Sequence, residues 1–89
     1  MKSEEEIRRL IQQKLSTGEL PSDECTKVLG GTSNGEICDA CGEAVAPNQL
    51  VMECIGDHYP KAVQFHVLCF YLWDAARREF GEPGNCARN

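Results

Sequence analysis

The sequence has no long apolar run and no basic amino-terminal segment. Its longest apolar stretch extends from Val67 to Trp73, whereas a membrane-spanning helix needs about 20 apolar residues. The chain begins with MKSEEE, which is acidic where a secretory signal is basic. These two absences argue against a membrane span and an export signal, and they predict a cytoplasmic protein.

Basic side chains are also few. Nine Lys and Arg residues stand against 14 Asp and Glu residues, which gives a net charge of −5. The acidic excess lies mainly in residues 36–89. Because Lys and Arg supply most of the affinity of proteins for nucleic acids, this charge argues against DNA or RNA as the partner.

The chain is too short for a large hydrophobic core. Its 89 residues are enough for one domain, and a core of this size contributes only about 3–5 kcal/mol to the free energy of unfolding. Six cysteines could add to this stability. In a reducing compartment they favour metal or thiol chemistry over disulfides.

The first segment has the pattern of an amphipathic helix. Ser3 and Glu6 form a capping box, and apolar residues follow at helical spacing. These apolar residues are Ile7, Leu10, Ile11 and Leu15. The pattern predicts a helix over residues 4–16 that ends near Gly18. A helix this short needs a surface to pack on.

A second, shorter helical turn is predicted after the Leu20-Pro21 pair. Ser22 can cap a turn that extends through Leu29 and ends before Gly30 and Gly31. Residues 32–35 are rich in turn-forming residues, so we place the end of the helical arm there.

Two short-spaced pairs of metal ligands are the strongest signal in the sequence. Cys38 and Cys41 form one pair, and His66 and Cys69 form the other after 24 intervening residues. Zn²⁺ prefers four such ligands in a tetrahedron, and two short pairs supply them from two rigid segments. We therefore predict one structural Zn²⁺ ion with every coordination position filled by protein.

The residues between and after the ligand pairs predict a hairpin and a helix. Residues 50–55 and 62–65 have strand character, and residues 56–60 read as a turn. An apolar helix is expected from His66 to about Gly81. A zinc knuckle at Cys38–Gly42, a hairpin and a carboxy-terminal helix together predict a small α+β zinc finger of treble-clef-like fold.

The predicted elements divide the chain into three parts. Residues 1–35 form a helical arm and connector, residues 36–81 form the zinc-binding module, and residues 82–89 form a flexible tail. No internal repeat is present.

Other roles for the cysteines and histidines remain open. Cys38 and Cys41 could be a thiol redox pair, although no βαβ frame precedes them. His58 is a rival nitrogen ligand, but its turn setting favours an exposed loop residue. Cys54 fits a small buried apolar residue in a strand. Cys25 and Cys86 are expected to be accidental, oxidisable thiols.

The ligand spacing resembles the first finger of LIM domains, although no second finger follows. Residues 35–73 also resemble a family of small bacterial proteins of unknown function. In that family a Cys-x₂-Cys pair precedes Phe-His-x₂-Cys-Phe-x-Leu-Trp, as it does here. The resemblance implies a bacterial cytoplasmic protein with a zinc site at the four residues Cys38, Cys41, His66 and Cys69, and no known activity.

A protein-interaction module is the function that the sequence favours. Full ligation leaves no open metal position for catalysis, so we do not expect an enzyme. The aromatic residues Phe70, Tyr71 and Trp73 should pack around the metal site, and any that stays exposed would mark a docking patch. The alternatives are a nucleic-acid-binding or transcriptional regulatory zinc finger, and a thiol redox protein.

Overall fold

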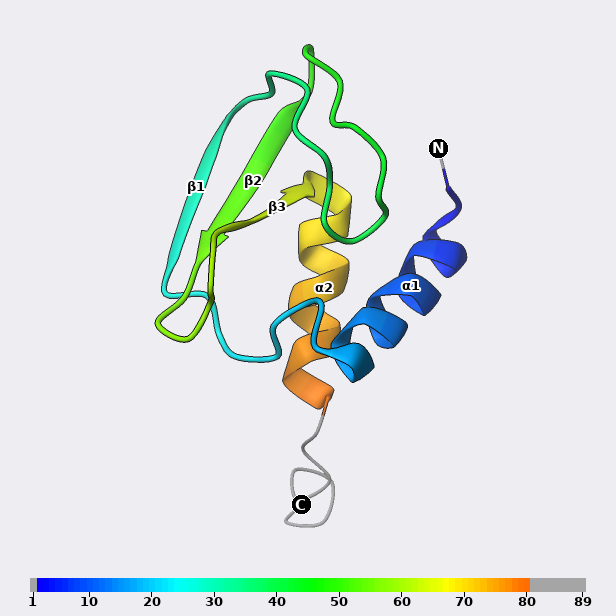
Figure 1. Ribbon diagram of the computed structural model, residues 1–89. Helices are drawn as coiled ribbons and strands as arrows, with labels where there is room; N and C mark the ends of the chain where they lie inside the picture. The colour runs from blue at the N-terminus through cyan, green and yellow to red at the C-terminus, as the bar shows by residue number, and fades with distance from the viewer. Residues whose placement is uncertain (1, 81–89) are drawn as a thin grey trace.

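The structure is a computed structural model that describes residues 2–80, with a three-stranded sheet and two helices (Figure 1). The helices are α1 (Glu4–Thr17) and α2 (Val67–Glu79), and the strands are β1 (Lys27–Thr32), β2 (Leu50–Ile55) and β3 (Val63–His66). The strands are antiparallel in the order β1-β2-β3. The expected small α+β architecture is confirmed. Gly81 and the predicted tail over 82–89 lie outside the described residues.

Helix α1 follows its predicted sequence signals. The Ser3 Oγ accepts a hydrogen bond from the Glu6 N–H at 3.2 Å, and the helix ends at Gly18 with a φ of 84°. Only glycine adopts this left-handed conformation without strain. Ile7, Ile11 and Leu15 are buried along one face, and Leu10 is half-buried at its margin. The helix extends to Thr17, one residue beyond the prediction.

The short helical turn predicted after Ser22 is wrong. Residues from Lys27 to Thr32 form β1, which pairs with β2 over its whole length. Val28 has a β-branched side chain, and Gly30 and Gly31 are poor helix formers. Pairing with β2, whose residues lie 18–28 positions further along the chain, supplies hydrogen bonds that one isolated helical turn cannot match.

The hairpin and the second helix are confirmed with small shifts. β2 has the predicted bounds, whereas β3 begins and ends one residue later than predicted. His66 is the last residue of β3 and the cap residue of α2, whose helical residues begin at Val67. The helix ends with Phe80 as its carboxy-terminal cap. No helix among residues 2–80 is long and apolar enough to cross a membrane.

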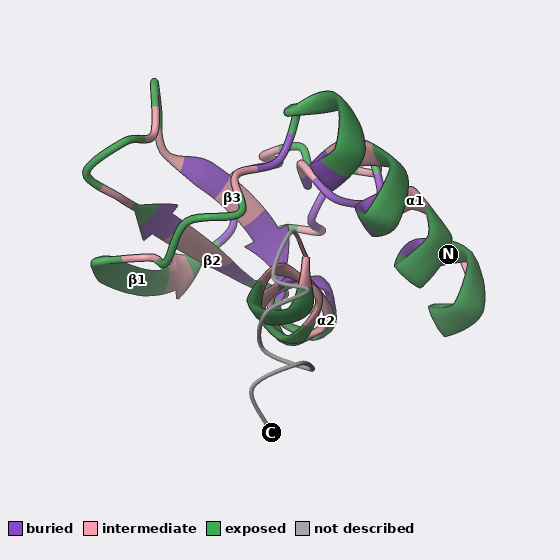
Figure 2. Cartoon of the chain, turned by 90° about the horizontal axis from the view of Figure 1, so that it is seen from below, coloured by how far each residue is buried: buried purple, intermediate pink, exposed green. Residues whose placement is uncertain are grey.

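One apolar core joins α1, α2 and the sheet. Trp73 of α2 is fully buried, and its ring stacks on Phe65 of β3 with centroids 4.9 Å apart. Its Nε1 donates a hydrogen bond to the Pro21 carbonyl at 2.9 Å, so the connector after α1 is fixed to α2. The buried face of α1 belongs to the same core, as the inward purple segments of the helix show (Figure 2).

These contacts cross the boundary that the sequence suggested at residue 35. β1 lies on the amino-terminal side of it and pairs with β2 on the other side. Lys14 of α1 also donates a hydrogen bond to the Asp39 carbonyl at 3.0 Å. The division into arm, module and tail stays a prediction about folding units, and it can be tested through α1.

Replacing Ile11 by alanine should lower the free energy of unfolding of the whole chain by about 2–5 kcal/mol, because the side chain is fully buried. Denaturant unfolding followed through Trp73 measures this directly, since Trp73 is the only tryptophan and lies on α2. Leu10→Ala is the matched control on the same helix and should cost less. An unchanged Trp73 transition in Ile11→Ala would mean that the arm unfolds separately.

Candidate metal centre

The first half of the candidate site is a tight turn between Cys38 and Gly42. The Cys38 carbonyl accepts a hydrogen bond from the Gly42 N–H at 2.9 Å, and the Cys38 N–H donates to the Glu43 carbonyl at 2.9 Å. Gly42 has a φ of 82°, a left-handed conformation that glycine adopts without strain. The turn is therefore a local structure that brings Cys38 and Cys41 together.

The second half lies where β3 joins α2. His66 keeps an extended backbone with φ −60° and ψ 156°, and Cys69 sits in the first turn of α2. The chain direction changes at His66, so a strand residue and a helix residue three positions apart can face the same point. The arrangement fixes the imidazole at the end of a strand rather than on a helix.

Asp39 connects the two halves. Its N–H donates to the Gln64 carbonyl at 2.7 Å, and its Oδ2 accepts from the Gln64 N–H at 2.8 Å. Gln64 lies two residues before His66, so the turn is attached to β3 close to the imidazole. Asp39 is a positioning residue that the sequence analysis missed. An Asp between two ligands does not indicate which distant backbone group it will bind.

The two halves bring four predicted ligands into one buried group, called here the four-ligand cluster: Cys38, Cys41, His66 and Cys69. Their ligand atoms all lie within 4.8 Å of one another, and all four residues are buried. The His66 Nδ1 lies 3.4 Å from the Cys41 Sγ and 3.9 Å from the Cys69 Sγ. The structure thus confirms that these side chains meet in a group that could hold a metal ion.

The spacing of the ligand atoms fits a tetrahedral ion. With bonds of about 2.3 Å to sulfur and about 2.0 Å to nitrogen, the sulfur and nitrogen ligands of a tetrahedral Zn²⁺ lie about 3.5 Å apart. The two measured sulfur–nitrogen distances fall on either side of this value.

The thiols of the four-ligand cluster differ in acidity. A hydrogen bond from Cys69, opposed by burial and aided by backbone hydrogen bonds at Cys41 and His66, lowers the pKa of Cys38 to about 4. The hydrogen bond with Cys38 raises the pKa of Cys69, since the donor must keep its proton. Burial raises the pKa of Cys41. The protein alone therefore favours one thiolate, and a cation is needed to hold three.

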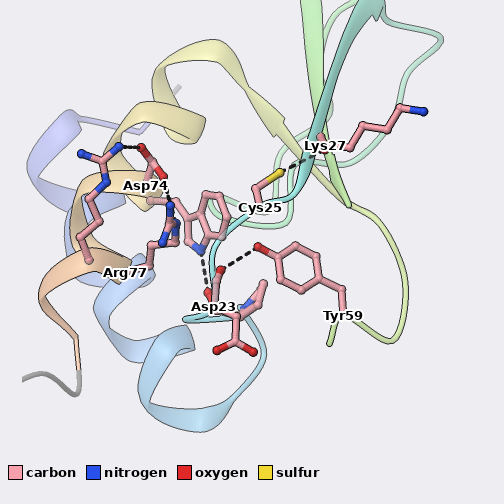
Figure 3. Close-up of polar contacts among 9 residues, drawn as sticks. Asp23, Cys25, Lys27, Tyr59, Asp74 and Arg77 are labelled. Atoms are coloured by element: carbon pink, nitrogen blue, oxygen red, sulfur yellow. Dashed lines mark hydrogen bonds and ion pairs between the residues drawn. The ribbon is translucent and has the colours of Figure 1, made fainter. Parts of the chain in front are cut away.

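Two other described cysteines lie apart from the cluster. Cys54 is fully buried in β2, where burial and then Cys25 raise the pKa of its thiol. This confirms the interpretation of Cys54 as a small buried residue. Cys25 is half-buried, and its Sγ donates to the Lys27 carbonyl at 3.1 Å (Figure 3). Cys86 lies outside the described residues.

The rival histidine and its turn are placed away from the four-ligand cluster. His58 is exposed in the turn between β2 and β3, as predicted. The neighbouring Tyr59 hydroxyl donates to the Asp23 carbonyl at 2.8 Å and so holds this turn against the connector that precedes β1 (Figure 3). These contacts support the fold and take no part in the metal site.

The aromatic residues after Cys69 divide between core and surface. Trp73 is fully buried and Phe70 is half-buried, as expected for side chains that pack around the site. Tyr71 is 62% exposed, which leaves an aromatic side chain on the surface of α2.

Comparisons with models of protein families, with curated proteins and with solved structures each found no match. The function is therefore argued from the geometry of the four-ligand cluster and its surroundings.

Asp39→Ala should weaken the affinity for a divalent metal ion by about 10–100-fold while leaving all four ligands in place, because the turn loses its attachment to β3. Asp39→Asn is the matched control: its side-chain oxygen can still accept the Gln64 N–H, so most of the affinity should be kept. The affinities of both variants for Co²⁺, used as the probe ion, can be measured by competition with a chromophoric chelator. Equal affinity in Asp39→Ala and the unmodified protein would contradict a positioning role.

Proposed function

We propose that the chain is a structural zinc-binding module that mediates a protein–protein interaction. The observation that carries the proposal is the burial of three cysteine sulfurs and one imidazole nitrogen within 4.8 Å of one another. Cys38, Cys41, His66 and Cys69 would hold the ion, and the ion would supply positive charge and four fixed bonds. The proposal includes the cytoplasmic location and the resemblance to small bacterial zinc proteins.

The ligand chemistry favours zinc with a structural role. Three thiolates and one imidazole are a common ligand set of structural Zn²⁺, whereas catalytic zinc keeps one position open for water or substrate. With four protein ligands the metal ion has no open coordination position for a reacting molecule. We therefore propose that the protein is not an enzyme. The order of turn, hairpin and helix around the ligands supports a treble-clef-like arrangement.

Metal binding would then supply much of the folding free energy. Structural Zn²⁺ contributes about 10–16 kcal/mol in small zinc units at neutral pH. The ion would join the turn at Cys38 and Cys41 to the start of α2. The same helix contributes Trp73 to the apolar core. Its release should therefore disorder the core as well as the ligands.

Apolar side chains on the surface beside the cluster support an interaction role. Leu50, Val67 and Leu68 are 56%, 37% and 42% exposed, and they line a shallow hollow of about 320 Å³ next to His66. Tyr71 lies one helical turn further along α2 and is more exposed still. A rigid surface with exposed apolar and aromatic residues is typical of protein-binding sites.

Elemental analysis of protein purified without a metal-binding tag should find one zinc per chain. Adding a strong chelator should abolish the near-ultraviolet circular dichroism of Trp73, because the core loses its packing with the metal. Cys38→Ser should behave like the chelated protein. Cys25→Ser is the matched control and should keep both zinc and the Trp73 signal, since Cys25 lies outside the four-ligand cluster.

A chain that contains no metal and keeps its Trp73 signal in chelator would contradict the structural role. Iron in place of zinc would contradict the identity of the ion. A folded Cys38→Ser variant that had lost a thiol oxidation activity would favour the redox alternative.

A further inference from the structure

Within the part of the chain that the structure describes, β1 forms one edge of the sheet and pairs only with β2. Its residues Lys27–Gly30 and Thr32 are exposed, and Gly31 is half-buried. Figure 1 shows the strand at the outer side of the sheet, away from both helices, and Figure 2 shows it mostly in the colour of exposed residues. The strand is therefore accessible along its length.

The register shows which backbone groups of β1 point outward. The Ser33 N–H donates to the Gln49 carbonyl at 3.0 Å, directly after the pair formed by Thr32 and Leu50. In an antiparallel pair, residues alternate between bonding to the partner strand and facing away from it. The N–H and C=O groups of Val28, Gly30 and Thr32 therefore point away from β2.

At the opposite edge of the sheet, formed by β3, outward backbone groups are hydrogen-bonded within the chain. On β3 the outward N–H and C=O of Gln64 are both bonded to Asp39. No corresponding backbone hydrogen bond to the outward groups of Val28, Gly30 or Thr32 occurs among residues 2–80. One edge is covered by the chain itself, and the other is open.

Apart from the charged Lys27 at its start, the open edge lacks the usual protection against strand pairing. Edge strands are commonly blocked by charged residues, proline or a bulge. Between Val28 and Thr32 there is no charge and no proline, and the register with β2 runs without interruption. Val28 and Leu29 are 43% and 41% exposed, one on each face of the strand.

We propose that β1 pairs with β1 of a second copy of this chain, antiparallel and with the two-fold axis at Gly30. This register uses every outward backbone group, because Gly30 faces the partner's Gly30 and Val28 faces the partner's Thr32. It also places Leu29 opposite the partner's Gly31. A Cβ added at Gly31 would have no atom of residues 2–80 within 4 Å, which leaves space above this glycine for the leucine.

Charge complementarity favours a second copy over an unrelated strand. The same register places Lys27 opposite the partner's Ser33. The Ser33 Oγ donates to the Glu36 carboxylate at 2.9 Å, and the Asn34 N–H donates to it at 2.6 Å, so an anion is held beside this position. Lys27 extends away from Cys25 and Tyr59 (Figure 3). In the proposed register each Lys27 would therefore lie near the partner's Glu36, and the two-fold symmetry would make this ion pair twice.

The pairing goes beyond the proposed zinc role and does not depend on which metal the chain binds. Each subunit needs only to be folded, so metal content and the Trp73 signal are measured on the same samples. Failure of the pairing can then be distinguished from failure of the metal site.

Sedimentation equilibrium of the metal-loaded chain, from micromolar to millimolar concentration, should show a shift from the 9.9 kDa monomer to twice that mass. Gly30→Pro should stay monomeric with its metal and Trp73 signal intact, because proline removes an N–H that faces away from β2. Gly30→Ala is the matched control: it keeps the N–H, its Cβ would lie 3.7 Å from the Met52 Sδ, and it should still dimerise. A monomer over the whole range, or a dimer unaffected by Gly30→Pro, would overturn the proposal.

Charge substitutions test the register. Lys27→Glu should weaken dimerisation several-fold, and Lys27→Glu combined with Glu36→Lys should recover it because the two charges are exchanged across the interface. Lys61→Glu makes the same change in net charge in the exposed turn before β3 and should leave dimerisation unchanged. Equal weakening by Lys27→Glu and Lys61→Glu would overturn the proposed register.

Discussion

Three cysteine sulfurs and one imidazole nitrogen lie in a small buried volume, where ionising all three thiols without a cation would place three negative charges side by side. The hydrogen bond from Cys69 lowers the pKa of Cys38, while the pKa values of Cys69 and Cys41 are raised. These directions favour one thiolate among the three cysteines, and a bound cation would favour ionisation of the other two. The stability of the surrounding core is coupled to this ionisation, because Cys69 and Trp73 lie on the same helix.

The position of the cluster depends on backbone pairing as much as on its ligands. Asp39 attaches the first cysteine pair to β3 through two hydrogen bonds with Gln64, and the ligand His66 follows two residues later. These bonds use the outward groups of β3 and so close that edge of the sheet. β1 has the same alternation on its own outer edge, where residues 2–80 provide no such cover. The two edges therefore differ: one lies beside the four-ligand cluster, and the other is the edge for which we propose pairing.

Local patterns were sufficient where an element depends on its own residues. The capping box at Ser3 and the apolar spacing through Leu15 predicted α1 to within one residue, and β2 was predicted with its observed bounds. The helical turn predicted through Leu29 was wrong, because the conformation of that segment is decided by β2, which lies far along the chain. Asp39 was missed for the same reason: its partner Gln64 is 25 residues away.

The sequence by itself determined the four candidate ligands and their grouping in two short-spaced pairs, because a turn and a helix start are local structures with local signals. It also determined that this short chain would need more than an apolar core. Only the tertiary structure decided that the pairs meet within 4.8 Å, that α1 shares the core of α2, and that β1 is an open edge. These features arise from contacts between distant segments, whose register no local pattern encodes.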